Sequence, residues 1–260
     1  MNKKSFILIC LVLLMVSGCI PGNIPEFTKG PIAVPEDILG KITMTTSGDI
    51  IRATANITLN SSEGRYSRKI ALLLKMPFCL RVETMPVFGP ADFFLSANEE
   101  SLKVFLPGEG KFYVGKATKE NLSLFLKVLL SPGDMVSILS GLPPQIMEGN
   151  LSEYVEGELY RVDIRSGKRK RSLWVNPNDY TLAKIEEIDD GRVIYRAAFR
   201  DPVVIDGRPY PGRIDMEVGE PGRASINIRY LDLELSPDEG TAAFDLRTPS
   251  GIVPVLIDRH

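Results

Sequence analysis

Histidine is almost absent from this 260-residue chain, because its one histidine, His260, is the last residue. A Ser–His–Asp triad and a histidine-containing zinc site both need histidine inside the fold, so neither is expected. The sequence also lacks the Gly-x-Ser-x-Gly elbow, the phosphate-binding P-loop and the dinucleotide fingerprint. We therefore expect a protein that is not an enzyme and that holds neither a metal nor a cofactor.

Cysteine and excess charge are scarce as well. The three cysteines, Cys10, Cys19 and Cys79, are uninformative about the redox compartment of the protein. Cys79 falls in an alternating apolar stretch, where a small buried hydrophobic residue is the expected role. The formal net charge is −2, which argues against general nucleic-acid binding.

The amino terminus has the pattern of a lipoprotein signal peptide. Lys3 and Lys4 precede an apolar run over residues 6–15, which is too short to span a bilayer as a helix. Val16-Ser17-Gly18-Cys19 then resembles the bacterial lipobox, in which the peptide is cut before the cysteine and the cysteine is lipidated. The alternative is an ordinary secretory signal with a chance cysteine. Ile20, rather than aspartate, follows Cys19, so the resemblance implies the outer membrane, facing the periplasm.

Three segments follow from this pattern. Residues 1–18 are predicted to be the signal peptide, and residues 19–35 the lipidated cysteine and its tether. The tether contains four prolines and two glycines, a composition typical of an extended spacer. We find no further linker and no internal repeat, so residues 36–260 are predicted to form a single domain.

Most of the domain alternates between apolar and polar residues, as strands with one buried face do. The pattern covers residues 51–59, 70–74, 79–84, 93–97 and 102–106, and returns between residues 160 and 233. We expect about ten to twelve antiparallel strands. The period changes at residues 119–140, where Thr118 and Ser131 are predicted helix N-caps and Gly141 a stop.

Four stretches carry a family resemblance. They are Lys75-Met76-Pro77-Phe78-Cys79-Leu80-Arg81-Val82-Glu83, Phe88-Gly89-Pro90, residues 107–115 (PGEGKFYVG) and residues 130–134 (LSPGD). Together they resemble the LolA/LolB-type lipoprotein carrier superfamily, and most of all its uncharacterised outer-membrane lipoprotein members. The resemblance covers residues 42–255. It implies a mainly β fold with a helical lid (α+β): a single curved antiparallel sheet forms an incomplete barrel, with helices packed on the concave face.

The same resemblance implies a cavity for acyl chains between sheet and lid. From the alternation, the candidate lining residues are Leu72, Leu74, Leu80, Val82, Phe93, Leu95, Val104, Leu106, Leu122, Phe125, Leu126, Leu129 and Ile138. The apolar loop 85–90 has two interpretations. Val87 and Phe88 either pack into the core or form an exposed finger that contacts membrane or cargo, as in LolB-type receptors.

Two charged stretches also have alternative interpretations. Residues 168–171, all basic, are either a charged hairpin that discourages edge pairing or a contact for anionic head groups. The acidic pairs Glu186-Glu187 and Asp189-Asp190 are predicted to form a solvated hairpin end. Asp232 and Glu234 are predicted to lie on the outer face of a strand.

The leading functional hypothesis is a membrane-anchored, periplasm-facing lipoprotein that binds lipid or lipoprotein acyl chains, as a carrier or receptor in envelope transport. Its partners would be acyl chains and, through Cys19, the membrane. The alternative is a structural or assembly lipoprotein, or an envelope-stress sensor, whose half-barrel binds a protein partner.

Overall fold

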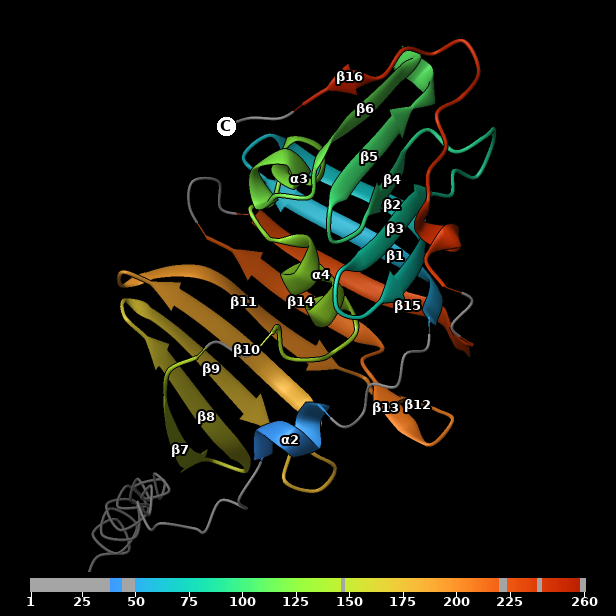
Figure 1. Ribbon diagram of the computed structural model, residues 1–260. Helices are drawn as coiled ribbons and strands as arrows, with labels where there is room; N and C mark the ends of the chain where they lie inside the picture. Colours follow the sequence, from blue (N-terminus) through green and yellow to red (C-terminus); the bar gives the residue numbers. More distant parts are fainter. Residues whose placement is uncertain (1–37, 44–49, 146–147, 220–223, 238–239, 258–260) are drawn as a thin grey trace, which may run out of the picture. The chain divides into compact units, whose positions relative to one another are not determined.

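The computed structural model describes residues 38–43, 50–145, 148–219, 224–237 and 240–257 (Figure 1). Contacts divide the chain after Gly30, and all described residues belong to the second part. This part is built on a 14-stranded sheet with the strand order β16-β6-β5-β4-β3-β2-β1-β15-β14-β11-β10-β9-β8-β7. Neighbouring strands are antiparallel, except that β16 runs parallel to β6.

The strands before the lid are β1 (Ile50–Ser61), β2 (Gly64–Lys75), β3 (Cys79–Thr84), β4 (Phe94–Ala97), β5 (Ser101–Leu106) and β6 (Lys111–Lys116), with the short helix η2 (Pro107–Glu109) between the last two. Those after it are β7 (Asn150–Glu156), β8 (Leu159–Ser166), β9 (Arg169–Val175), β10 (Leu182–Asp189), β11 (Arg192–Arg200), β14 (Arg213–Val218), β15 (Ala224–Ser236) and β16 (Val255–Leu256). A separate hairpin joins β12 (Val203–Ile205) to β13 (Arg208–Tyr210).

The predicted strand count was therefore too low, since sixteen strands lie among the described residues. Three of the missed strands, β12, β13 and β16, have only two or three residues, too few to show alternation. The fourth, β7, is an edge strand whose residues are mostly exposed, so it has no buried face to leave an apolar pattern.

The predicted inward faces of the early strands are correct. Leu72 lies opposite Val82, Val82 opposite Leu95, and Leu95 opposite Val104. All four side chains are buried. Because successive residues point to opposite sides of a strand, this register places polar residues such as Lys103 on the outer face.

Two helices form the lid, α3 (Lys119–Leu126) and α4 (Pro132–Leu139). The predicted caps are present: the Thr118 hydroxyl accepts from the Asn121 amide, and the Ser131 hydroxyl accepts from the Asp134 amide. Helix α3, which contains Leu122, does not extend to Leu129, however. It ends at Leu126, and the residue that caps it, Lys127, has a left-handed φ of 57°. The chain then alternates, so Val128 and Leu130 are buried and Leu129 only partly so.

The sheet is curved and unclosed, and α3 and α4 cross its concave face (Figure 1). This confirms the predicted fold class. A third helix, α2 (Ile38–Thr43), was not predicted. It buries Ile38 and Ile42 in the same core, and Lys41 Nζ donates a hydrogen bond to the Tyr180 hydroxyl at 3.2 Å. Within the described ranges, no helix combines the length and apolar character needed to cross a membrane.

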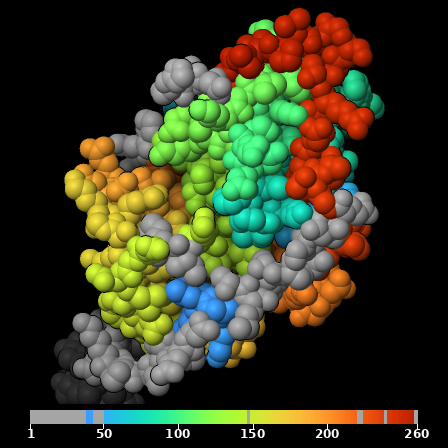
Figure 2. All heavy atoms as spheres, viewed as in Figure 1, coloured from blue at the N-terminus to red at the C-terminus, as the bar shows by residue number. Residues whose placement is uncertain are grey.

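The chain after β15 packs on the outer face of β3–β5. Here the short helix η3 (Ala242–Phe244) accepts a hydrogen bond from Arg81 Nη1 to the Ala243 carbonyl at 2.8 Å, and Lys103 pairs with Asp245 at 2.6 Å. Phe244 is buried there, and its carbonyl accepts a hydrogen bond from the Ser96 hydroxyl of β4. In Figure 2 this red stretch borders the teal strands, while the yellow-green lid lies in the middle of the face in view.

Candidate functional site

The candidate site is the apolar sheet face beneath the lid. Burial there is nearly complete for most of the predicted lining residues. At most 2% of the surface is exposed for Leu72, Leu74, Leu80, Leu95, Val104, Leu122 and Ile138, and 8% for Val82. Phe93, Leu106, Phe125 and Leu126 are partly buried and pack against this cluster. The sequence thus identified one continuous apolar surface, formed by strands and helices together.

The side chains of the lid fill the hollow of the sheet in this arrangement. Phe125 of α3 packs on Tyr113 of β6, with ring centroids 5.2 Å apart. Four of the pockets in the described part of the chain have volumes of about 240 to 840 Å³, and most of their lining is on the outer face or the strand ends. Of the predicted lining residues, Leu72 borders one of the four and Leu129 another. Because Leu95, Val104 and Leu122 are fully buried, a ligand can reach them only if the helices move.

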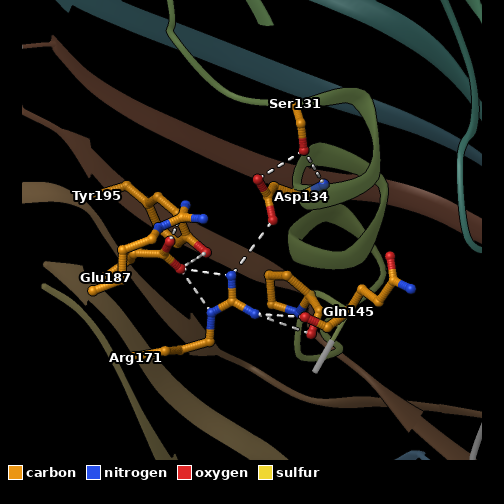
Figure 3. A network of polar contacts seen from close by, with 8 residues as sticks. Ser131, Asp134, Gln145, Arg171, Glu187 and Tyr195 are labelled. Carbon is orange, nitrogen blue, oxygen red and sulfur yellow. Dashed lines mark hydrogen bonds and ion pairs between the residues drawn. The ribbon is translucent and has the colours of Figure 1, made fainter. Parts of the chain in front are cut away.

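A buried polar network joins the lid to the sheet (Figure 3). Arg171 of β9 and Glu187 of β10 lie opposite each other and point toward α4. Arg171 Nε donates to Glu187 Oε2 at 2.7 Å, and Arg171 Nη2 lies 2.6 Å from the same oxygen. Both side chains are at most 4% exposed. Arg169 Nη2 reaches Glu187 Oε1 at 2.6 Å, and the Tyr195 hydroxyl donates to Glu187 Oε2 at 3.4 Å.

Arg171 also contacts the lid itself. Its Nη2 lies 3.7 Å from Asp134 Oδ1 in the first turn of α4, and its Nη1 donates to the Gln145 carbonyl at 2.8 Å, just after α4. At the other end of the helix, the Tyr230 hydroxyl of β15 donates to the Leu139 carbonyl at 2.6 Å. The apolar underside of α4 is thus flanked by polar attachments to both halves of the sheet.

Burial and neighbouring charges keep Arg171, Tyr195 and Tyr230 each in one protonation state near pH 7. Burial by itself would lower the pKa of the Arg171 guanidinium, but the negative charge of Glu187 and its hydrogen bond with Arg171 hold that pKa above its ordinary value. Burial raises the pKa of the Tyr195 phenol far above its ordinary value, and it does the same for Tyr230. Arg171 is therefore charged and both phenols neutral near pH 7, so both can donate their hydrogen bonds.

The prediction that Glu187 belongs to a solvated hairpin end was wrong, because Glu187 is 1% exposed. A usable signal was present in the sequence: Glu187 is two residues from the buried Ile185, and Arg171 is two residues from the buried Leu173. Strand alternation puts each charge on the same face as its apolar neighbour. Two opposite charges at inward positions of neighbouring strands indicate a buried pair.

Lys168 and Lys170 of the 168–171 stretch are paired as well, Lys168 with an exposed acid and Lys170 with a buried one. Lys168 contacts Asp190 at 3.0 Å, and Lys170 contacts Asp163 at 3.3 Å. These pairings argue against a contact for head groups, and because β8 and β9 lie inside the sheet, between β7 and β10, the hairpin does not protect a sheet edge either. In the described ranges, no group of histidine, cysteine, aspartate and glutamate side chains is placed to hold a metal ion.

The loop 85–90 between β3 and β4 extends into solvent. Val87 is 89% exposed and Phe88 is 91% exposed, and Met85 is partly exposed. Of the two interpretations of this loop, the structure therefore has the exposed finger. Pro86 and Pro90 restrict the backbone on either side of the apolar tip.

Comparisons with known proteins bear on the fold. Neither a protein-family model nor a curated protein matches the sequence. Solved structures do match. One is a domain named among outer membrane lipoprotein-sorting proteins, from Vibrio parahaemolyticus (16% identity, 80% of this chain, 94% of that chain, TM-score 0.57). Another is a LolA superfamily protein from Nitrosomonas europaea (18% identity, 80% of this chain, 96% of that chain, TM-score 0.55).

A third similar structure is a DUF1329 family protein from Desulfovibrio piger (16% identity, 80% of this chain, 95% of that chain, TM-score 0.56). At these identities the likeness concerns the fold, and it extends over nearly the whole of each matched chain. The chain therefore has the LolA-like fold that its turns and strands resemble, a curved, unclosed antiparallel sheet under a helical lid.

Proposed function

We propose that this protein binds the acyl chains of lipids or lipoproteins between the sheet and the lid, as a carrier or receptor in the cell envelope. The observation that carries the proposal is the composition of the covered face. Strands β2–β5 present aliphatic side chains, and α3 and α4 place Leu122 and Ile138 over them. Burying each such side chain contributes about 1.5–3 kcal/mol, and an acyl chain replacing the lid would restore much of that burial.

The way the lid is attached supports its displacement. Its polar contacts to the sheet are few: Arg171 and Tyr230 hold α4, the Asn121 side chain of α3 donates to the Lys116 carbonyl of β6 at 3.0 Å, and most of the remaining interface is apolar. Apolar contacts are not directional, so the helices can slide or lift without leaving a new polar group unpaired, provided that water replaces these few polar contacts. The names of the matched Vibrio and Nitrosomonas proteins, which refer to lipoprotein sorting and to LolA, agree with this proposal.

Native mass spectrometry tests the proposal directly. The chain without residues 1–19, purified from a bacterial host without delipidation, should carry bound lipid that is released on solvent extraction. The protein mass should return to its sequence value after extraction. A preparation with the sequence mass from the start, which also takes up no added fatty acid, would contradict acyl-chain binding.

We propose further that Cys19 anchors the protein to the membrane, although residues 1–37 lie outside the described part of the chain. Two or three acyl chains, at about 0.8 kcal/mol per buried CH₂, hold a protein durably. Cys19→Ser should abolish metabolic palmitate labelling and move the protein to the soluble fraction. Cys79→Ser, a matched control, should leave labelling unchanged. Labelling that persists in Cys19→Ser would contradict the anchor.

A second candidate function is a structural or assembly role, in which the half-barrel binds a protein partner. The burial of most of the concave face favours it, because a solid core needs no ligand. The two functions differ in whether the parent protein takes up an apolar probe, which the Discussion addresses.

A further inference from the structure

The sheet has a step at the base of the exposed finger. Strand β3 pairs with β2 only over residues 70–75, while residues 64–69 of β2 pair with β1 alone. At the step, the Met85 amide donates to the Lys69 carbonyl at 2.8 Å, and the chain leaves the sheet into the finger. The first half of β2, residues 64–69, therefore meets the base of the finger at Lys69.

This half of β2 is basic and exposed. Arg65, Arg68 and Lys69 are all exposed, and none of the three forms an ion pair with any described residue. Arg68 Nη1 donates only to the neighbouring Ser67 carbonyl, at 3.0 Å. We call these three residues the cationic step. Because adjacent residues of a strand point to opposite faces, Arg68 and Lys69 lie on the two sides of the sheet at the base of the finger.

Further cations continue from Lys69 across the outer face. Lys69 lies opposite Asn56, which lies opposite Arg229. Arg229 lies opposite Arg213, which in turn lies opposite Arg200. Asp215 pairs with Arg213 and Arg200, at 2.9 and 3.0 Å, and is the acid that compensates this row. Like charges directly opposite one another destabilise a sheet, so an anionic partner would relieve this arrangement.

The nearby acids do not neutralise the step. Glu63 is at the hairpin tip before Arg65, and Asp92, at the far end of the finger, accepts a hydrogen bond from the Thr84 hydroxyl at 2.5 Å. The finger itself, residues 85–90, has no acid. An uncharged apolar tip flanked by unpaired cations is the arrangement by which proteins enter a membrane surface, with the tip among acyl chains and the cations at the phosphates.

We propose that the cationic step makes the protein select an anionic membrane surface: Arg65, Arg68 and Lys69 bind lipid phosphates, while Val87 and Phe88 of the finger, which the family resemblance already implies as a contact, enter the apolar layer. This inference rests on the acyl-chain function proposed above, and it adds which leaflet chemistry the protein selects. Each cation near an anionic surface strengthens binding roughly fivefold, so the three together contribute about a hundredfold.

Vesicle binding can distinguish the contribution of the cationic step to membrane affinity from that of the finger tip. The full chain carrying Cys19→Ser, to remove the anchor, is titrated with phosphatidylcholine vesicles with and without phosphatidylglycerol. The parent should bind the anionic vesicles more tightly, and added salt should weaken this preference. The triple variant Arg65→Gln, Arg68→Gln, Lys69→Gln should lose about a hundredfold in affinity for anionic vesicles and keep its affinity for neutral ones. Phe88→Ser should weaken binding to both.

A matched control is the triple variant Arg165→Gln, Lys168→Gln, Arg192→Gln. It removes the same charge from turns of β8–β11, and its anionic binding should fall far less. Equal losses in both triple variants would show an effect of net charge alone and overturn the inference. The inference would also be overturned if Phe88→Ser weakened vesicle binding while the triple variant of the cationic step bound anionic vesicles as the parent does. That result would leave the proposed function intact. Binding of an acidic polypeptide by a parent that ignores both vesicles would overturn membrane docking.

Discussion

Glu187→Gln is expected to lower the free energy of unfolding by about 3–5 kcal/mol, one of the two largest effects predicted for this protein. The substitution keeps the shape of the side chain but leaves Arg171, 4% exposed, without its main counterion. Asp134 at 3.7 Å then remains as a weaker partner. Removing one member of a buried pair is costly because the other charge stays desolvated. Chemical denaturation of parent and variant measures the difference.

Two variants control this result. Arg171→Met combined with Glu187→Gln removes both charges and keeps an acceptor for the Tyr195 hydroxyl, so it should recover most of the lost stability. Glu217→Gln removes an exposed carboxylate, 71% accessible and 3.9 Å from Arg196, and should cost less than about 1 kcal/mol. A cost for Glu187→Gln that is no larger than for Glu217→Gln would show that the network does not hold the fold.

The double variant also reports on the lid. In it, the carbonyl of Gln145 loses its donor and α4 loses the charge facing Asp134. If the network holds the lid closed, the double variant should take up a fluorescent fatty acid faster than the parent at similar stability. Unchanged uptake kinetics would restrict the network to a structural role.

The sequence was sufficient to predict the sheet, the lid and their apolar contact surface. Alternation placed Leu95 and Val104 inward, and the caps at Thr118 and Ser131 placed the helices. These signals are local, because each depends on residues within one turn or one strand. Helix α2 was missed because it has only six residues, and its burial depends on a contact surface formed by distant strands.

Alternation could have placed Arg171 and Glu187 inward, but their pairing, and the row of cations that continues from Lys69, could not be predicted from local patterns. Arg171 and Glu187 are sixteen residues apart, and their pairing is decided by the register of β9 and β10. The alternation of β10 is itself disturbed by a bulge between Glu187 and Ile188. Similarly, Lys69 and Arg229 share a row only because β1 lies between β2 and β15. Long-range register of this kind is not encoded in local patterns.

Two neighbouring residues of β5, Val104 and Lys103, can be used to test whether the lid covers a binding site or a solid core. Val104 is fully buried under the lid, and Lys103, its neighbour on β5, points to the outer face. The two residues lie on the same strand but on opposite faces of the sheet. A tryptophan at each therefore tests the concave face with the outer face as the control.

Val104→Trp should abolish uptake of a fluorescent fatty acid that the parent protein binds. The indole would occupy the space that an acyl chain needs when the lid is displaced, and it would overpack the closed state by about 1–3 kcal/mol. Thermal melting beside probe titration separates these effects, since a folded variant that binds no probe has lost the site and not the fold. Lys103→Trp removes the ion pair with Asp245, 2.6 Å apart, and should bind the probe as the parent does.

Phe125→Ala extends the comparison to the lid. A fully buried phenylalanine in a solid core would cost about 3–5 kcal/mol on truncation, whereas Phe125 is only partly buried and packs on Tyr113 at the margin of the lid. We therefore expect a smaller loss of stability than this range, together with altered probe affinity. A parent that binds no probe, with large losses of stability in both Val104→Trp and Phe125→Ala, would instead identify the covered face as a solid core. The scaffold function would then account for the fold, because the half-barrel would offer a partner its outer surface and not its interior.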